Sequence, residues 1–291
     1  MTERDKRVRP TDQQMLTSSW NQNMYIWLRN LSGANYSMGA TIRNFAELAS
    51  DQRRPLRVLE ITDGLPLKSL ELRGKEFRQR GDMLIYGSKG SHPRPDIETT
   101  VITKDDMIET LLEGRLDVDT KHEAETLRKF ILPALDVNVG YIDEVNVQVG
   151  RRAGLTAFQK LREEGRIAVI SREEPLHALM RLVGDGKRFD LAFVDAQTIE
   201  DKVSYFTLIQ GLLSESGVAY VPVEWWSPKA HSHGSGVDQY RVWRETRIGK
   251  RGEEDLEDYL ASEYPTAFET AAFPGAKTLI IKGTSEPVAI E

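Results

Sequence analysis

Strand-like and helix-like segments alternate without interruption over residues 166–223, and this alternation is the feature that most limits the folds open to the chain. Short apolar runs rich in β-branched residues occupy 166–170, 189–194 and 218–223. The segments between them, 174–183 and 199–214, place apolar residues every three or four positions, as amphipathic helices do. Parallel neighbouring strands need connections of this length. The pattern therefore predicts an α/β fold, with a mostly parallel sheet covered by helices on both faces.

The N-terminal region has a helical pattern of its own. Apolar residues recur at helical spacing over 15–49, with a break around Ser32-Gly33, which predicts two amphipathic helices. We expect residues 1–50 to form an N-terminal helical cap. No repeat and no long low-complexity linker divides the remainder, so residues 51–291 are predicted to form one Rossmann-like domain.

The C-terminal region predicts an antiparallel addition to the sheet. Two β-rich runs, 267–273 and 277–281, are joined by Pro274-Gly275-Ala276, and this short turn suits a β-hairpin.

Two segments compete for the second strand of the sheet, after a first strand at 56–61. One is 83–86, at a distance that suits a single crossover. Residues 87–145 then form an insertion or lid, because they fit the alternation poorly. The other candidate is 145–150, which makes 82–144 the excursion. The sequence leaves both alternatives open.

Composition excludes several classes of function. The chain has no cysteine, so it cannot form a disulfide, a thiolate metal site or a cysteine nucleophile. Its 39 Lys and Arg against 45 Asp and Glu give a net charge of −6, without an overall basic field that would attract nucleic acid or an anionic membrane. No apolar run approaches the roughly 20 residues of a membrane helix, and no signal peptide is evident. We expect a cytoplasmic protein with a small-molecule substrate; homo-oligomer formation stays open.

Residues 188–196, Arg-Phe-Asp-Leu-Ala-Phe-Val-Asp-Ala, resemble the fourth-strand motif of class I S-adenosylmethionine-dependent methyltransferases, especially small-molecule O-methyltransferases. Residues 212–221 are similar to the family's fifth strand, and 57–61 are similar to its first. The C-terminal hairpin resembles the part of the family's sheet that holds its antiparallel seventh strand. The resemblance implies a Rossmann-like methyltransferase fold, S-adenosylmethionine as the cofactor, and methyl transfer as the activity.

The turn after the first strand carries the cofactor contacts that the resemblance implies. In the family this turn is rich in glycine, because a side chain would collide with the cofactor. Here Gly64 matches one glycine, whereas Thr62 and Pro66 stand where two others are expected. The implied cofactor-binding residues are Glu60, Thr62, Asp63, Gly64, Ser88, Arg172 and Asp195.

A carboxylate that accepts hydrogen bonds from both ribose hydroxyls is the other contact implied by the family, at the end of the second strand. If 83–86 is that strand, the chain continues into Ser88 and Lys89 without an acid, and the insertion has to hold the sugar. If 145–150 is that strand, Gln148 or Arg151 lies near the ribose.

Four residues near the expected crevice are candidates for proton removal. Asp195 ends an apolar strand, which predicts a carboxylate at the edge of the sheet where α/β proteins bind ligands; the alternative is a helix N-cap. Glu224 directly follows the predicted fifth strand and is a candidate general base. His231 and His233 place imidazoles in the next loop, either over the crevice or on the surface without a role.

Three hypotheses of function follow. The first is methyl transfer from S-adenosylmethionine to a hydroxyl or other nucleophile of a small molecule. Related metal-dependent enzymes carry metal ligands where this chain has Pro222 and Val223, so no metal is predicted. The second, motivated by Thr62 and Pro66, is a catalytically inactive, methyltransferase-like binding or assembly subunit. The third is a nucleic-acid cap or base methyltransferase.

Overall fold

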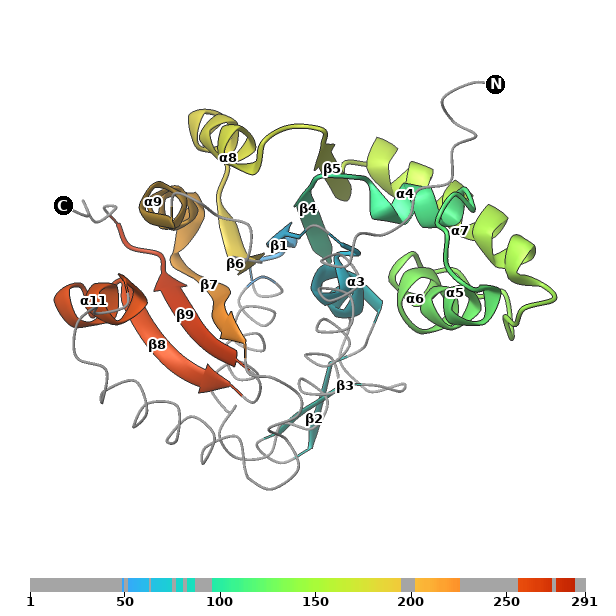
Figure 1. The fold of residues 1–291 in the computed structure, drawn as a ribbon, viewed down its shortest axis with the longest axis horizontal. Coiled ribbons are helices and arrows are strands. Elements are labelled where there is room, and N and C mark those ends of the chain that lie inside the picture. The colour runs from blue at the N-terminus through green and yellow to red at the C-terminus, as the bar shows by residue number, and fades with distance from the viewer. Residues whose placement is uncertain are drawn as a thin grey trace.

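A seven-stranded sheet forms the centre of the computed structural model, which describes residues 49, 52–62, 64–74, 77–80, 83–86, 96–194, 202–225, 256–273 and 276–285 (Figure 1). Its strands, in spatial order, are β5 (Ile167–Ser171), β4 (Ile97–Thr103), β1 (Leu56–Ile61), β6 (Phe189–Val194), β7 (Leu213–Trp225), β9 (Ala276–Lys282) and β8 (Phe268–Phe273). The first five are parallel, and β9 runs antiparallel to both of its neighbours. This is the strand order of the class I methyltransferase fold, so the predicted fold class and hairpin are confirmed.

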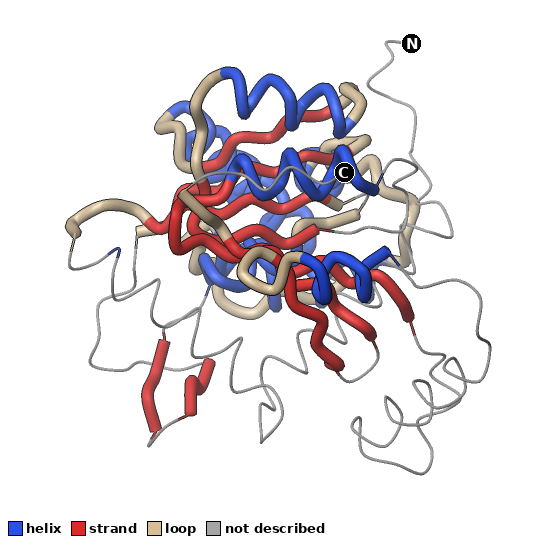
Figure 2. Tube along the Cα trace, turned by 90° about the vertical axis from the view of Figure 1, so that its left-hand side faces the viewer, coloured by secondary structure: helices blue, strands red, loops and turns tan. Residues whose placement is uncertain are grey.

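The central strands are mostly apolar because helices cover both faces of the sheet (Figure 2). All six residues of β6 are buried, and β1 leaves only Arg57 partly exposed. The helices are α3 (Leu67–Gly74), α4 (Met107–Leu112), α5 (Thr120–Thr126), the π-helix η2 (Leu127–Ile131), α6 (Leu132–Ala134), α7 (Val147–Glu163), α8 (Pro175–Gly184), α9 (Lys202–Leu212) and α11 (Leu256–Glu263).

Two hydrophobic clusters divide the core. The larger one joins α8, α9 and α11 to side chains of β1, β6, β7, β8 and β9. The other joins α3 to the helices between β4 and β5, with Leu70, Leu111, Ile131 and Phe158 among its buried members. The residues between β4 and β5 therefore build a helical lobe with its own core.

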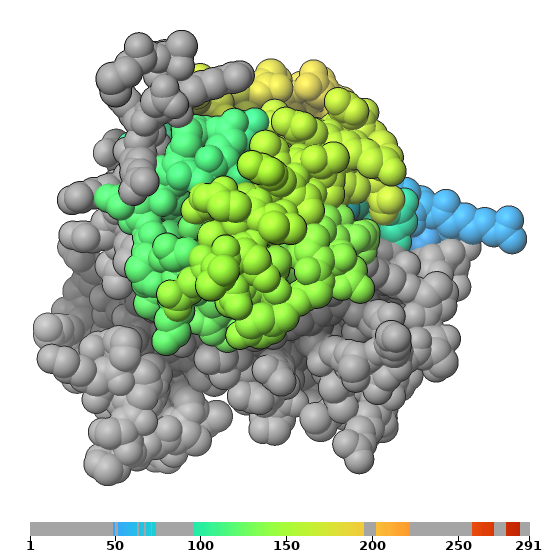
Figure 3. Space-filling view, turned by 90° about the vertical axis from the view of Figure 1, so that its right-hand side faces the viewer, coloured from blue at the N-terminus to red at the C-terminus, as the bar shows by residue number. Residues whose placement is uncertain are grey.

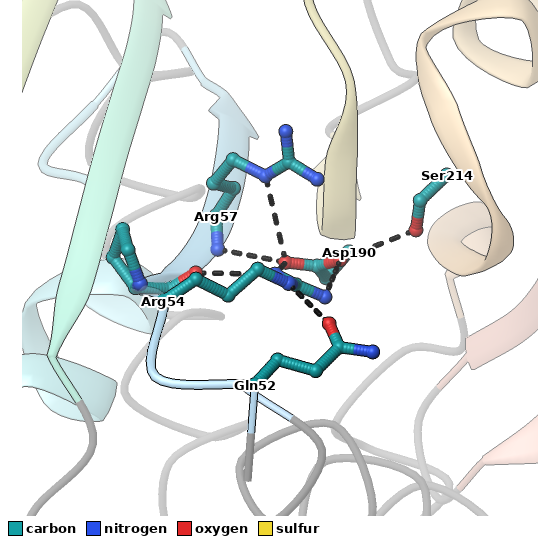
Figure 4. Close-up of polar contacts among 6 residues, drawn as sticks. Gln52, Arg54, Arg57, Asp190 and Ser214 are labelled. Atoms are coloured by element: carbon teal, nitrogen blue, oxygen red, sulfur yellow. Dashed lines mark hydrogen bonds and ion pairs between the residues drawn. The ribbon is translucent and has the colours of Figure 1, made fainter. Parts of the chain in front are cut away.

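A buried carboxylate anchors the strands at the amino edge of the sheet (Figure 4). Arg54 donates to both oxygens of Asp190, at 2.6 and 3.0 Å, and the backbone N–H of Arg57 donates at 3.0 Å. Ser214 Oγ lies 3.2 Å from the same carboxylate. Asp190 is only 1% exposed, so these donors replace the water it loses. The contacts connect the start of β6 to β1 and to β7.

Both predictions of the second strand are wrong. Residues 83–86 form β3, which pairs with β2 (Phe77–Arg80) in a separate two-stranded antiparallel sheet. Residues 147–150 belong to α7, whose buried face includes Val147 and Gly150. The second position in the sheet belongs to β4, which pairs with β1 on one side and with β5 on the other.

Residues 97–103 are therefore part of the central sheet, although they fall within the predicted insertion at 87–145. The helical lobe begins after this strand. The predicted cap at 1–50 lies outside the described residues except for Ala49, and the domain division stays a prediction. Among the helices that are described, none has the length and apolar character needed to cross a membrane.

Replacing Asp190 by Asn should lower the free energy of unfolding by about 2 kcal/mol, because Arg54 and the Arg57 N–H lose a buried charged acceptor. Urea denaturation measures the change. Asp185→Asn, at an exposed carboxylate on the C-cap of α8, is the matched control and should stay within about 0.5 kcal/mol. Equal effects of the two substitutions would contradict the anchoring role.

Candidate functional site

The carboxyl edge of the sheet holds the candidate site. In the sheet, β4 and then β5 lie on one side of β1. The next strand along the chain, β6, lies on the other side of β1. Such a reversal of strand order opens a crevice beyond the carboxyl ends of the two strands, and ligands of open α/β sheets bind there. Ile61, the last residue of β1, is in register with Val194, the last residue of β6. The carboxyl ends of β1 and β6 therefore lie side by side.

Thr62 fixes the turn that leaves β1. Its backbone N–H donates to Ile102 O of β4 at 3.0 Å, which continues the pairing of the two strands. Its hydroxyl accepts a hydrogen bond from the N–H of Gly64 at 3.2 Å. The residues of this turn, Thr62, Gly64, Leu65 and Pro66, are all buried. A side-chain hydrogen bond thus holds a turn that glycine residues form in the family.

Glu60 lies just before this turn, and its side chain caps the N-terminus of α3. Its carboxylate is fully buried and accepts hydrogen bonds from the backbone N–H groups of Ser69, at 2.7 Å, and Lys68, at 3.4 Å. These amides belong to the first turn of α3, where N–H groups have no partner within the helix. Burial raises the pKa of Glu60, and the nearby Lys68 charge and these hydrogen bonds oppose the shift.

Two carboxylates follow β4 at the same edge. Asp106 caps α4 by accepting a hydrogen bond from the N–H of Glu109 at 3.0 Å, and it lies 3.5 Å from Arg162. Burial raises the pKa of Asp106. Asp105 is half-buried, and its carboxylate has no hydrogen bond or ion pair among the described residues. Asp105 is thus a half-buried carboxylate, two residues after the end of β4, without a partner in the described part of the chain.

Sequence reasoning missed Asp105 because it placed the second strand elsewhere. The available signal was the acidic pair Asp105-Asp106, which follows Thr-Thr-Val-Ile-Thr at 99–103 after the single residue Lys104. The alternative ribose contact at Arg151 is wrong, since this guanidinium forms a largely buried ion pair with Glu123 of α5.

The remaining predicted site residues have different outcomes. Arg172 follows β5 at the same edge, with a positive φ of 64° and an exposed side chain, and its N–H donates to Lys104 O at 3.2 Å. Glu224 lies within β7, where its backbone is in register with Lys277 of β9, because this strand continues past the predicted end at 223. Asp63, Ser88, Asp195, His231 and His233 lie outside the described residues, so their roles stay predictions.

No protein-family model matches the chain, and no curated protein sequence matches it. Solved structures give low-scoring matches. An O-methyltransferase family protein from Burkholderia thailandensis is 11% identical, with a TM-score of 0.36 over 94% of this chain and 71% of its own. The fibrillarin pre-rRNA processing protein of Methanococcus jannaschii is 9% identical, with a TM-score of 0.31 over 80% of this chain and 68% of its own. Because these scores are low, the functions of these proteins are not transferred to this chain.

The buried Glu60 predicts a specific dependence of stability on pH. Its raised pKa means that the folded state binds this proton more tightly than the unfolded state. Its contribution to stability is therefore full below the ordinary pKa of a glutamate and is lost as the pH rises through the raised pKa. Glu60→Gln removes this titration, so the stability of the variant relative to wild type should rise as the pH increases above the ordinary pKa of a glutamate.

Urea unfolding at a series of pH values measures this difference. Glu98→Gln is the matched control, because Glu98 is an exposed carboxylate at the other end of the neighbouring strand, and its curve should stay parallel to wild type. A parallel curve for Glu60→Gln would show that the burial of Glu60 does not shift its titration.

Proposed function

We propose that this chain is an S-adenosylmethionine-dependent methyltransferase, and that it methylates a hydroxyl or other nucleophile of a small molecule. The observation that carries the proposal is the buried carboxylate of Glu60, which occupies the N-terminus of α3 at the switch point of the sheet.

Dinucleotide-binding sheets use the same helix N-terminus to bind a pyrophosphate. In this chain the amides of Lys68 and Ser69 already donate to Glu60. A phosphate at this place would lose those donors, because they are already bonded to a buried side chain. A cofactor without phosphate therefore suits the site. S-adenosylmethionine is such a cofactor.

The other described residues at the edge fit the same cofactor. The turn held by Thr62 and Gly64 brings the backbone to the crevice. Asp105 follows the adjacent strand, where a carboxylate accepts hydrogen bonds from ribose hydroxyls in folds of this kind. We assign the ribose to Asp105, in place of the insertion that the sequence suggested.

The chemistry proposed for the chain is mainly alignment. The cofactor supplies a methyl group on a sulfonium, which is an activated leaving group. The chain has to position the nucleophile in line with that methyl group and exclude water. We assign removal of the proton from the nucleophile to Asp195, which directly follows the buried strand β6, with Glu224, His231 and His233 as further candidates.

An inactive binding or assembly subunit is the second candidate, because Thr62 and Pro66 fill two positions of the turn with buried side chains. Binding of the cofactor separates the two candidates.

Isothermal titration with S-adenosylmethionine and S-adenosylhomocysteine should give binding in the micromolar range. Asp105→Ala should weaken both about 10-fold or more, because it removes a charged acceptor of hydrogen bonds. Glu98→Ala, at the opposite end of the same strand, is the matched control and should bind like wild type. NAD should give no heat, because Glu60 already occupies the amides that would bind a pyrophosphate.

Each result has a distinct meaning. No heat from either sulfur compound would support the inactive subunit. Binding that Asp105→Ala leaves unchanged would keep the activity but refute the ribose assignment, and equal binding of NAD would refute the role given to Glu60.

A further inference from the structure

The start of α7 and the loop before it expose an unusual group of apolar side chains. Val145 is 92% exposed, Tyr141 is 66% exposed and Val149 is 57% exposed. These residues belong to the helical lobe between β4 and β5, which faces the viewer in green to yellow-green in Figure 3. Clustered apolar residues on the surface indicate an interaction site more often than isolated ones do.

The loop that carries these side chains is held by its own hydrogen bonds. The carboxylate of Asp143 accepts from the N–H groups of Val145, at 3.0 Å, and Asn146, at 3.1 Å. The Asn146 side chain accepts from the Asp143 N–H at 2.8 Å and donates to Tyr141 O at 2.9 Å. Binding of a partner costs less entropy when the contacted loop is held in advance by hydrogen bonds of this kind.

The opposite face of α7 is clamped to the lobe. Val147, Gly150, Gly154 and Phe158 are buried along it. A Cβ atom at Gly154 would lie 2.6 Å from a methyl carbon of Leu112, so α7 packs against α4 at a distance that requires glycine at this position. The core of the lobe is therefore complete without Val145 and Val149.

Two opposite charges flank the exposed valines. Glu144 and Arg152 are both exposed, and neither side chain forms a hydrogen bond or an ion pair among the described residues. Glu144 lies in the turn before α7, next to Val145, and Arg152 lies within the helix, three positions after Val149. The two charges thus stand at opposite ends of the run of exposed valines, so a two-fold axis at its middle brings Glu144 of one copy opposite Arg152 of the other.

We propose that this surface, the α7 face, is a two-fold interface at which a second copy of this chain binds. Tyr141, Val145 and Val149 form its apolar centre, and Glu144 and Arg152 form its charged rim. This arrangement matches the apolar core and polar rim of protein interfaces, and it is complementary to itself in charge. The proposal is independent of the proposed cofactor and activity.

Sedimentation velocity of the full chain over about 1 to 100 μM tests the interface, a range that covers affinities typical of modest contact areas. Wild type should convert from monomer to dimer within it. Val145→Asp should weaken the dimer at least about 10-fold, since it places a charge in the apolar centre. Met180→Asp is the matched control, because Met180 is 55% exposed on α8, outside the α7 face, and it should leave the dimer unchanged.

A charge exchange tests the symmetry directly. Glu144→Arg and Arg152→Glu should each weaken the dimer, because like charges then face one another, and the double variant should restore it to within about 3-fold of wild type. Thermal unfolding of every variant at low concentration should match wild type, because these side chains are exposed. A wild-type chain that stays monomeric, a dimer that resists Val145→Asp, or a double variant that shows no recovery would each overturn the proposal.

Discussion

The fully buried carboxylate of Glu60 is the constraint on which the arrangement of the candidate site depends. A buried carboxylate needs donors, and in this chain it takes them from the backbone of α3. The bond fixes α3 relative to the end of β1, and with it the turn that runs between them. It also limits which ligands suit the crevice, because the helix N-terminus that binds a phosphate in other nucleotide-binding sheets is already occupied by the side chain of Glu60.

The two ends of β1 use buried carboxylates for different purposes. At the amino edge, Asp190 is surrounded by donors from Arg54, Arg57 and Ser214, which satisfy it and connect three strands. At the carboxyl edge, Glu60 is satisfied by backbone donors, and Asp105 is left without a partner in the described part of the chain. The buried carboxylate at the amino edge is thus used in holding the sheet, whereas the half-buried Asp105 follows the carboxyl end of β4, the edge at which α/β sheets bind ligands.

How far the sequence predicts this structure depends on how continuous each pattern is. The strand β6 was predicted with its exact bounds, because all of its residues are buried and all but Asp190 are apolar. The strand β4 was missed, because Glu98, Thr99 and Thr100 interrupt its apolar character, although the backbone pairs on both sides. Asp105 was missed for the same reason, because a residue can be assigned to the end of a strand only when that strand is known. The adjacency of β1 and β6 was predictable, because it follows from the alternation and the family resemblance together.

The mistaken strand at 145–150 has a physical cause that bears on the lobe. Valines at 145, 147 and 149 alternate as they do in a half-buried strand, but only Val147 enters the core. In a helix, residues two positions apart point in different directions, so the other two valines are left in solvent. The three valines therefore have different surroundings. Val147 packs inside the lobe, whereas Val145 and Val149 belong to the exposed α7 face. The same local sequence thus misled the assignment of secondary structure and marks the α7 face.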